Sequence, residues 1–221
     1  METLQPIMNP LLLTLKIAAV STFFVAVLGL LLAYVLAKKE FRGKWLADVL
    51  VTLPLVLPPT VTGYILVILL GKNGVLGGVF TRITGSGILF TWQAAAIAAF
   101  VVSLPFMVKT ASSSIGAVDR SIEEAAHILG RSELETALFI TLPLAKKGII
   151  AGCVLSFARA VGEFGATLMV AGNIQGKTST MPLSIYGAYQ TGNNELASLL
   201  VIVLVGMSFL TIAATNRLGE R

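Results

Sequence analysis

Charged side chains are scarce in this sequence. Asp, Glu, Lys and Arg make up only 12% of the 221 residues, whereas an ordinary soluble domain carries about 25%. Four stretches contain no charge and are each long enough to cross a bilayer, which takes about 20 helical residues; residues 17–36 form the first of them. This composition excludes an ordinary soluble domain and indicates an integral membrane protein.

Cysteine and histidine occur once each, as Cys153 and His127. One cysteine excludes an internal disulfide, and its place in an apolar run predicts a packing residue. The sequence has no cluster of histidine and cysteine to hold a metal, so we expect neither a metal nor a cofactor. The phosphate-loop pattern G-x-x-x-x-G-K-[ST] is absent as well. We therefore expect no enzymatic activity, and no ATP hydrolysis by that route.

The apolar runs and their polar borders predict an all-α integral membrane fold with five transmembrane helices. We place the spans at about 11–37, 46–70, 88–108, from Pro143 onward, and 196–216. The glycine-rich residues 71–87 are predicted to form a short loop. Residues 171–195 are predicted to form a polar outer segment that includes a short interfacial helix. We interpret residues 1–221 as a single transmembrane domain.

The distribution of basic residues predicts which side each loop faces. With residues 118–143 placed inside, eleven basic residues lie on the inner side, namely Lys38, Lys39, Arg42, Lys44, Lys109, Arg120, Arg131, Lys146, Lys147, Arg217 and Arg221. Only three lie outside, namely Lys72, Arg82 and Lys177. Because cytoplasmic loops carry the excess of Lys and Arg, the N-terminus is predicted outside and the C-terminus inside. The net charge of +5 then follows from membrane topology, and we expect lipid and not nucleic acid beside this chain.

A polar segment, residues 118–143, interrupts the apolar sequence. It predicts two short helices with a turn at Gly130, where a left-handed residue would end the first helix. Pro143 is predicted to stop the second helix. Helices of under about 12 residues are marginal alone in water, so we expect this pair to lean on the membrane bundle and on a partner.

Capping patterns and apolar stripes place these two helices. Ser121 precedes Glu124, and Ser132 precedes Glu135, by the three residues of a capping box. Apolar positions then recur at helical spacing, and they are Ile122, Ala125, Ala126 and Leu129 in the first helix and Leu134, Ala137, Leu138 and Thr141 in the second. His127 falls on the polar side of the first helix, where we interpret it as a solvated or interface residue.

Three prolines fall within residues 53–59, LPLVLPP, inside the second predicted span. Prolines break the backbone hydrogen-bond ladder, and a bilayer tolerates such a break only where protein or water covers it. We interpret Pro58 and Pro59 either as a broken helix beside a translocation path or as a kink or re-entrant turn that serves packing. Thr60 and Thr62 follow directly and have hydroxyls that can bind an oxyanion.

Arg159 and Glu163 are charges inside the fourth predicted span. Residues four apart can share a helix face and pair, and a charge near mid-bilayer costs at least about 2.5 to 3.5 kcal/mol, so it should face protein or water. The pair either lines or gates a pathway or locks two helices together. Small residues recur every fourth position of the same span and predict close helix packing; they are Gly148, Gly152, Ser156 and Ala160.

The polar segment resembles the EAA loop of ABC-importer permeases, in which Glu-Ala-Ala, Gly and Ile-x-Leu-Pro recur at fixed spacing. The matching residues, with the helix start that precedes them, are Ser121, Glu124, Ala125, Ala126, Gly130, Ile140, Leu142 and Pro143. The resemblance implies the type I importer permease fold. It also implies that the loop is cytoplasmic and that residues 121–131 form a coupling helix seated on a separate ATPase subunit.

Two further blocks, residues 53–64 and 156–174, resemble the permease subunits of molybdate ABC transporters; sulfate and tungstate permeases share much of the second block. The resemblance implies a permease homodimer in the inner cell membrane, over two ATPase subunits and fed by an extracytoplasmic molybdate-binding protein. The candidates for a translocation path or gate in these blocks are Pro58, Pro59, Thr60, Thr62, Arg159, Glu163, Phe164 and Thr167.

Two alternatives stay open beside molybdate import. One keeps the family but changes the substrate to sulfate or tungstate. The other changes the class to a self-contained anion channel or secondary transporter. Secondary transporters commonly contain internal repeats, which the two halves of this sequence do not show convincingly, and such a protein would not need the polar segment.

Overall fold

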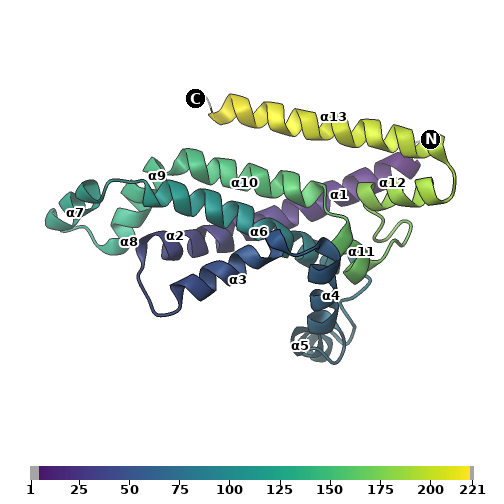
Figure 1. Cartoon of the computed structure of the whole chain (residues 1–221), viewed down its shortest axis with the longest axis horizontal. Coiled ribbons are helices and arrows are strands. Elements are labelled where there is room, and N and C mark those ends of the chain that lie inside the picture. The colour runs from purple at the N-terminus through teal and green to yellow at the C-terminus, as the bar shows by residue number, and fades with distance from the viewer. Residues whose placement is uncertain (1–4, 220–221) are drawn as a thin grey trace.

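The computed structural model describes residues 5–219, with side chains through residue 213, and every regular element in that part of the chain is a helix (Figure 1). The all-α prediction is therefore confirmed. Three helical runs are long and apolar enough to cross a membrane, and the number rises to five if each of two bent pairs counts as one span. Residues 220–221 of the predicted basic tail lie outside the described residues.

The first span is one continuous rod of 34 residues. It consists of α1 (Gln5–Phe24), a π-helical turn η2 (Val25–Gly29) and α2 (Leu30–Lys38). In α1 the buried Thr14 hydroxyl donates to the carbonyl of Pro10 and accepts from the backbone N–H of Met181, at 2.8 Å in both cases. This bond fastens the first span to α12 (Met181–Gln190), an element 167 residues further along the chain.

The second span is broken where the prolines predict. α3 (Lys44–Val56) and α4 (Pro59–Leu70) meet at an angle of 117°. Neither Pro58 nor Pro59 has an N–H to continue the ladder of α3. Pro59 instead occupies the first turn of α4, where the missing donor would be unpaired anyway.

The prediction of a loop over residues 71–87 is wrong, because α5 (Val75–Thr84) forms there. The glycines allow close packing at this place. A Cβ on Gly77 would lie 2.1 Å from the carbonyl oxygens of Leu70 and Gly71. These glycines let α5 fold back against the end of α4, although a run of glycines is more typical of a flexible loop.

The core lies between α6 (Trp92–Gly116) and α10 (Lys146–Val161). The predicted small-residue face is confirmed as a packing face: a Cβ on Gly152 would lie 2.9 Å from the Met107 sulfur, and the Ser156 hydroxyl donates to the carbonyl of Ser103 at 3.2 Å. Cys153 is half-buried in α10, with its sulfur 3.9 Å from that of Met107.

α6 begins later than the predicted residue 88 and extends past 108 to Gly116. Its start is set by Thr91, whose extended backbone and side-chain oxygen cap the helix by accepting from the N–H of Ala94 at 3.3 Å. The preceding Phe90 has a positive φ of 61°, which is incompatible with helix continuing backwards to residue 88.

The polar segment forms α7 (Arg120–Ile128), α8 (Glu133–Thr136), the π-helical turn η3 (Ala137–Thr141) and α9 (Leu142–Leu144). Gly130 has the predicted positive φ, at 84°. The capping box at α8 is confirmed, because the Ser132 hydroxyl accepts from the N–H of Glu135 at 3.2 Å and the Glu135 carboxylate accepts from the N–H of Ser132 at 2.9 Å.

One local prediction in this segment is wrong. Asp119, and not Ser121, caps α7, and its carboxylate accepts from the backbone N–H of Ser121 at 2.9 Å. Asp119 takes the cap because its backbone is extended directly before the first helical residue. The second helix ends at Leu144, one residue after Pro143, so it does not continue unbroken, as the proline predicts. The chain bends by 74° one residue later, before α10.

The remaining helices complete the molecule. α11 (Gly165–Ala171) follows α10 after a short break, and α13 (Asn194–Gly219) includes the whole of the predicted last span. α13 lies along the edge of the molecule (Figure 1), with only 11% of its apolar window buried. The short helix predicted within 171–195 is α12, whose first residues Met181 and Leu183 are fully buried.

Candidate functional site

The helix α7 lies at the end of the molecule opposite to α12 (Figure 1). Of the apolar stripe predicted for it, only Ala126 is buried. Ile122 and Leu129 are 45% and 84% exposed, and the neighbouring Ile128 is 86% exposed. In a helix this short, an apolar face left open by its own chain is typical of a protein-binding surface.

The residues of the predicted coupling loop are brought together at this end of the molecule. Ser121, Glu124 and Ala125 are exposed, whereas Ile140 and Leu142 are half-buried in the second helix. The second stripe is split: Ala137 and Thr141 are buried, and Leu134 and Leu138 are 70% and 51% exposed. Pro143 is exposed beside them.

A charged cluster, defined by Lys38, Lys39, Glu123, Glu133 and Thr141, lies under α7. Lys38 and Glu123 form an ion pair at 2.8 Å with side chains only 13% and 14% exposed. The Glu123 carboxylate also accepts from the Thr141 hydroxyl at 2.6 Å. Lys39 pairs with Glu133, and its hydrogen bond holds the pKa of that carboxyl below its ordinary value.

The sequence alone does not reveal Glu123 and Lys38 as partners. They are 85 residues apart, and no spacing rule links the end of the first span to the polar segment. Glu123 also stands beside Glu124, and sequence alone does not say which of two adjacent carboxylates turns inward. A cavity of about 340 Å³ opens beside the pair, lined by both glutamates and by Tyr34, Arg120 and His127.

The second group of candidates gathers where α4 and α11 touch. A Cβ on Gly165 would lie 2.8 Å from the Cβ of Pro59, and one on Gly63 would lie 2.8 Å from the Cα of Ala166. The two helices approach this closely only because both positions are glycine. The prolines here were predicted from the sequence as site candidates, but the two glycines that allow this close contact were not.

The hydroxyl candidates differ in their surroundings. Thr62 is 4% exposed, and its hydroxyl has no hydrogen-bond partner in the described part of the chain. Thr167, in α11, is 1% exposed, whereas Thr60, Pro58 and Pro59 are exposed. α4 therefore has one exposed and one buried hydroxyl directly after the prolines, and α11 has a buried one.

Arg159 and Glu163 pair as predicted. An Arg159 guanidinium nitrogen lies 2.8 Å from Glu163 Oε2; the charges are in contact, although the geometry falls short of a hydrogen bond. Glu163 is 3% exposed, and its Oε1 accepts from the N–H of Ala166 at 2.8 Å. The carboxylate thus holds both Arg159 and the start of α11. The next residue, Phe164, packs edge-on against Tyr186 of α12, with ring centroids 5.2 Å apart.

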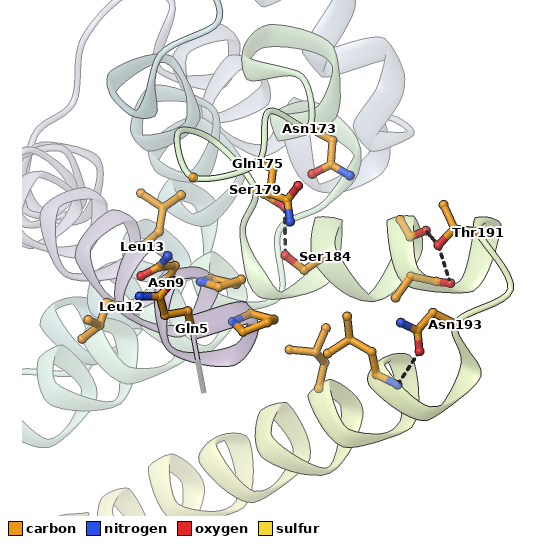
Figure 2. A pocket seen from close by; sticks show the side chains of 17 residues that line it. Gln5, Asn9, Leu12, Leu13, Asn173, Gln175, Ser179, Ser184, Thr191 and Asn193 are labelled. Atoms are coloured by element: carbon orange, nitrogen blue, oxygen red, sulfur yellow. Dashed lines mark hydrogen bonds between the residues drawn. The ribbon is translucent and has the colours of Figure 1, made fainter. Parts of the chain in front are cut away.

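A polar cavity of about 690 Å³ lies beside α12 (Figure 2), and α12 is at the opposite end of the molecule from α7 (Figure 1). Amides and hydroxyls line it, including those of Asn9, Asn173, Gln175 and Thr191. The Ser179 and Ser184 hydroxyls, also in its wall, are hydrogen-bonded at 2.8 Å. Neither charged side chains nor the predicted pathway residues are among the described residues that line it.

The part of the chain that the structure describes holds no group of three or more His, Cys, Asp and Glu placed to bind a metal. His127, on the exposed side of α7, has its Nδ1 3.1 Å from the carbonyl oxygen of Arg131. This contact joins the helix to the turn that follows it, and so gives His127 a local structural partner.

Comparison with known proteins gives the class. The family model of the binding-protein-dependent transport system inner membrane component matches residues 25–221, so this chain belongs to that family. It is a permease component of an ABC transporter and an inner-membrane protein.

Named relatives show which transport systems within the family have permeases similar to this chain. The molybdenum transport system permease protein ModB of Haemophilus influenzae is 38% identical over 210 residues, which cover 95% of this chain and 92% of that protein. ModB of Escherichia coli is 38% identical over 217 residues, 98% of this chain and 95% of that protein. The sulfate transport system permease protein CysW of Synechococcus elongatus is 35% identical, over 95% of this chain and 73% of that protein.

Solved structures agree on the fold. A chain of a bacterial ABC transporter that imports the acidic polysaccharide alginate has a TM-score of 0.80 at 16% identity, covering 99% of this chain and 82% of that one. A chain of the MetNI methionine ABC transporter in an inward-facing conformation has a TM-score of 0.75 at 18% identity, covering 99% and 97%. This likeness identifies the ABC importer permease fold.

Proposed function

We propose that this chain is the permease subunit of an ATP-driven ABC importer that carries molybdate across the cytoplasmic membrane. Family membership defines the class. The observation that supports molybdate as the substrate is the 38% identity to two ModB permeases over almost the whole chain. Sulfate is the alternative that a specific finding supports, because a sulfate permease is 35% identical.

The proposed topology has five spans, with the N-terminus outside and the C-terminus inside. Each bent pair, Lys44–Val56 with Pro59–Leu70 and Glu133–Leu144 with Lys146–Val161, is taken as one span. The eleven inner and three outer basic residues counted above support this orientation. Residues 1–221 then form one membrane domain with residues 118–143 in the cytoplasm, and the polar cavity opens to the outside.

The proposed partners are a second copy of this chain, two ATPase subunits and an extracytoplasmic molybdate-binding protein. The open apolar face of α7 supports the ATPase contact, since its most exposed residues, Ile128 and Leu129, have no cover from their own chain. Glu124 is exposed on the same helix and supplies a polar contact there. ATP is hydrolysed by the partner, and this chain has no catalytic residue.

The proposed path for the anion runs beside the junction of α4 and α11. Hydroxyls and backbone N–H groups at helix starts bind oxyanions without a cage of cations. The unpaired Thr62 hydroxyl and the exposed Thr60 supply donors here. The pair Arg159–Glu163 and the flanking Phe164 and Thr167 hold α11 in place beside this path.

Uptake into proteoliposomes tests the proposal. The permease is reconstituted with its ATPase and its binding protein, and radioactive molybdate uptake is measured with and without ATP. We expect uptake that requires ATP and the ATPase, and that excess molybdate suppresses more than sulfate does. Stronger suppression by sulfate or tungstate reassigns the substrate. Uptake that persists without the ATPase instead shows a channel or secondary transporter.

A further inference from the structure

The coupling helix α7 has two adjacent glutamates that differ in exposure. Glu124 is exposed, whereas Glu123 turns toward the body of the permease and has a side chain only 14% exposed. Both of its carboxylate oxygens are used: Oε2 accepts from the Lys38 ammonium at 2.8 Å, and Oε1 from the Thr141 hydroxyl at 2.6 Å. Glu123 therefore joins three separate elements, α2, α7 and η3.

This ion pair differs from the others at the same end of the molecule. The pairs Lys44–Glu40 and Arg131–Glu135 have at least one side chain more than half exposed and link residues only four apart. Lys39–Glu133 links residues that are 94 apart, but its side chains are 45% and 58% exposed. Exposed pairs of that kind contribute little to stability. Lys38–Glu123 is shielded from water on both sides, and removing one partner of a shielded pair leaves a charge without compensation.

The partner that Glu123 holds is the end of the first span. Lys38 is the last residue of α2, and the rod from Gln5 to Lys38 is unbroken. Its far part is fastened by Thr14 to the start of α12, one of the helices that line the polar cavity. A displacement of α7 therefore acts on a stiff element that reaches the opposite end of the molecule.

We propose that Glu123 is a positioning residue for transport: through Lys38 and Thr141 it fixes α7 to the first span, so that movement of the coupling helix moves that span. This rests on the proposed function, in which α7 receives the motion of an ATPase. The exposed Glu124 faces the partner, and the shielded Glu123 passes the motion into the permease. Loss of Glu123 therefore uncouples transport from ATP hydrolysis while the ATPase still binds.

The test measures molybdate transported per ATP hydrolysed in the reconstituted full complex. For Glu123→Ala we expect the ATPase to copurify and the ratio to fall roughly threefold or more, within the range that coupling mutations produce. The reciprocal exchange Lys38→Glu with Glu123→Lys keeps opposite charges in contact, and the new ammonium can donate to Thr141; we expect it to restore most of the ratio. Glu40→Gln, in the exposed pair with Lys44, is the matched control and should leave the ratio unchanged.

A normal ratio in Glu123→Ala overturns the proposal while leaving the proposed function intact, because ATP-driven uptake then continues. The proposal is also overturned if the reciprocal exchange assembles with the ATPase but its ratio of molybdate to ATP stays low, because a pair of opposite charges at these positions then does not restore coupling. If Glu123→Ala prevents assembly, the ratio of molybdate to ATP is measured for Glu123→Gln instead, because this variant keeps an acceptor for Thr141 and loses only the charge. A normal ratio there overturns the role of the ion pair. Uptake that needs no ATPase in the unmodified protein refutes the proposed function itself.

Discussion

At the scale of single residues, Gly130 is the position where sequence and structure agree most simply. The first helix must end in a residue with positive φ, and Gly130 has a φ of 84°. Space is not the constraint, because a Cβ there would meet nothing within 4 Å. The constraint is the left-handed backbone itself, which costs a residue with a side chain about 1 to 2 kcal/mol.

We therefore expect Gly130→Val to loosen the turn between α7 and α8 and to reduce copurification of the ATPase. Gly116→Ala is the matched control, because its Cβ would also meet nothing within 4 Å and its φ is not positive. Hydrogen exchange over residues 120–136 measures the effect in the permease. Equal protection in the two variants would show that the turn does not depend on glycine.

The pair Arg159–Glu163 is the residue-scale feature whose role the sequence left open. The Glu163 side chain is 2% exposed and that of Arg159 is 27% exposed. Water can therefore solvate the guanidinium better than the carboxylate, and the carboxylate charge needs its partner more. We expect Arg159→Met to lower the thermal unfolding midpoint by several degrees, and more than Glu163→Gln, whose amide oxygen still accepts from Ala166. Leaving one charge of a buried pair alone costs up to about 3 to 5 kcal/mol, and the exposure of Arg159 reduces this figure.

The double variant Arg159→Met with Glu163→Gln removes both charges, and we expect it to recover most of the lost midpoint. If it recovers uptake as well, the pair is structural. If the midpoint recovers and uptake does not, the charges act in transport. If the double variant is no more stable than Arg159→Met, the unpaired carboxylate of Glu163 is not the cause of the lost stability.

At the scale of elements, the start of α8 predicts a dependence on pH. The backbone N–H of Ser132, and then its hydroxyl, donate to Glu135 and hold the pKa of its carboxyl below the ordinary 4.5. A lowered pKa in the folded state means that this stabilisation is present above pH 4.5 and is lost as the pH falls through the lower folded value.

We expect the protection factors of α8 amides to fall when the pH is lowered through that range. Glu135→Gln keeps an acceptor for Ser132 but does not titrate, so its protection should fall less over the same pH range, with the remaining fall due to Glu133, whose carboxyl pKa is also lowered. Hydrogen exchange of the permease in detergent makes the comparison. Identical pH profiles for the two proteins would place the titrating group elsewhere.

The contact between α4 and α11 is the second element-scale test. Gly165→Ala places a methyl 2.8 Å from the Pro59 Cβ, which forces the two helices apart. Gly162→Ala, three residues earlier, meets only the Ala158 carbonyl oxygen at 3.8 Å and serves as the control. We expect Gly165→Ala to lose uptake and to lower the unfolding midpoint, and Gly162→Ala to change neither. Full uptake in Gly165→Ala would show that this close approach is dispensable.

The sequence predicted elements whose signal is local. The prolines at 53–59 located the break between α3 and α4, and the apolar runs located the first and last spans. Three local predictions failed because the same residues are compatible with more than one local structure. Asp119 competes with Ser121 for the cap, Thr91 delays the start of α6, and the glycines of 71–87 serve packing in place of a loop.

What depends on residues far apart in sequence could not be predicted. Lys38 with Glu123, and Thr14 with Met181, lie 85 and 167 residues apart. Their pairing follows from how the helices pack, which no periodicity encodes. The packing of Gly63 and Gly165 against the facing helix is also a property of two elements together, and the same is true of the polar cavity.

At the scale of the whole molecule, the two proposed contact regions lie at opposite ends of one helical bundle. α7 lies at one end and α12 at the other (Figure 1). The side chains of Ile122 and Ile128 in α7 are exposed, and the polar cavity lies beside α12. The first span reaches from the cavity to the charged cluster under α7. An ATPase at one end and a binding protein at the other would then act on the same rigid rod.

Photo-crosslinking in the assembled transporter tests this arrangement most directly. A photoreactive residue is placed at Leu129, which directly follows α7 and is 84% exposed, and separately at Val75 in α5, which is 77% exposed. Both positions are open and apolar, so exposure does not distinguish them. The account predicts that Leu129 captures the ATPase subunit and Val75 does not. Capture of the ATPase from Val75, with none from Leu129, would contradict it.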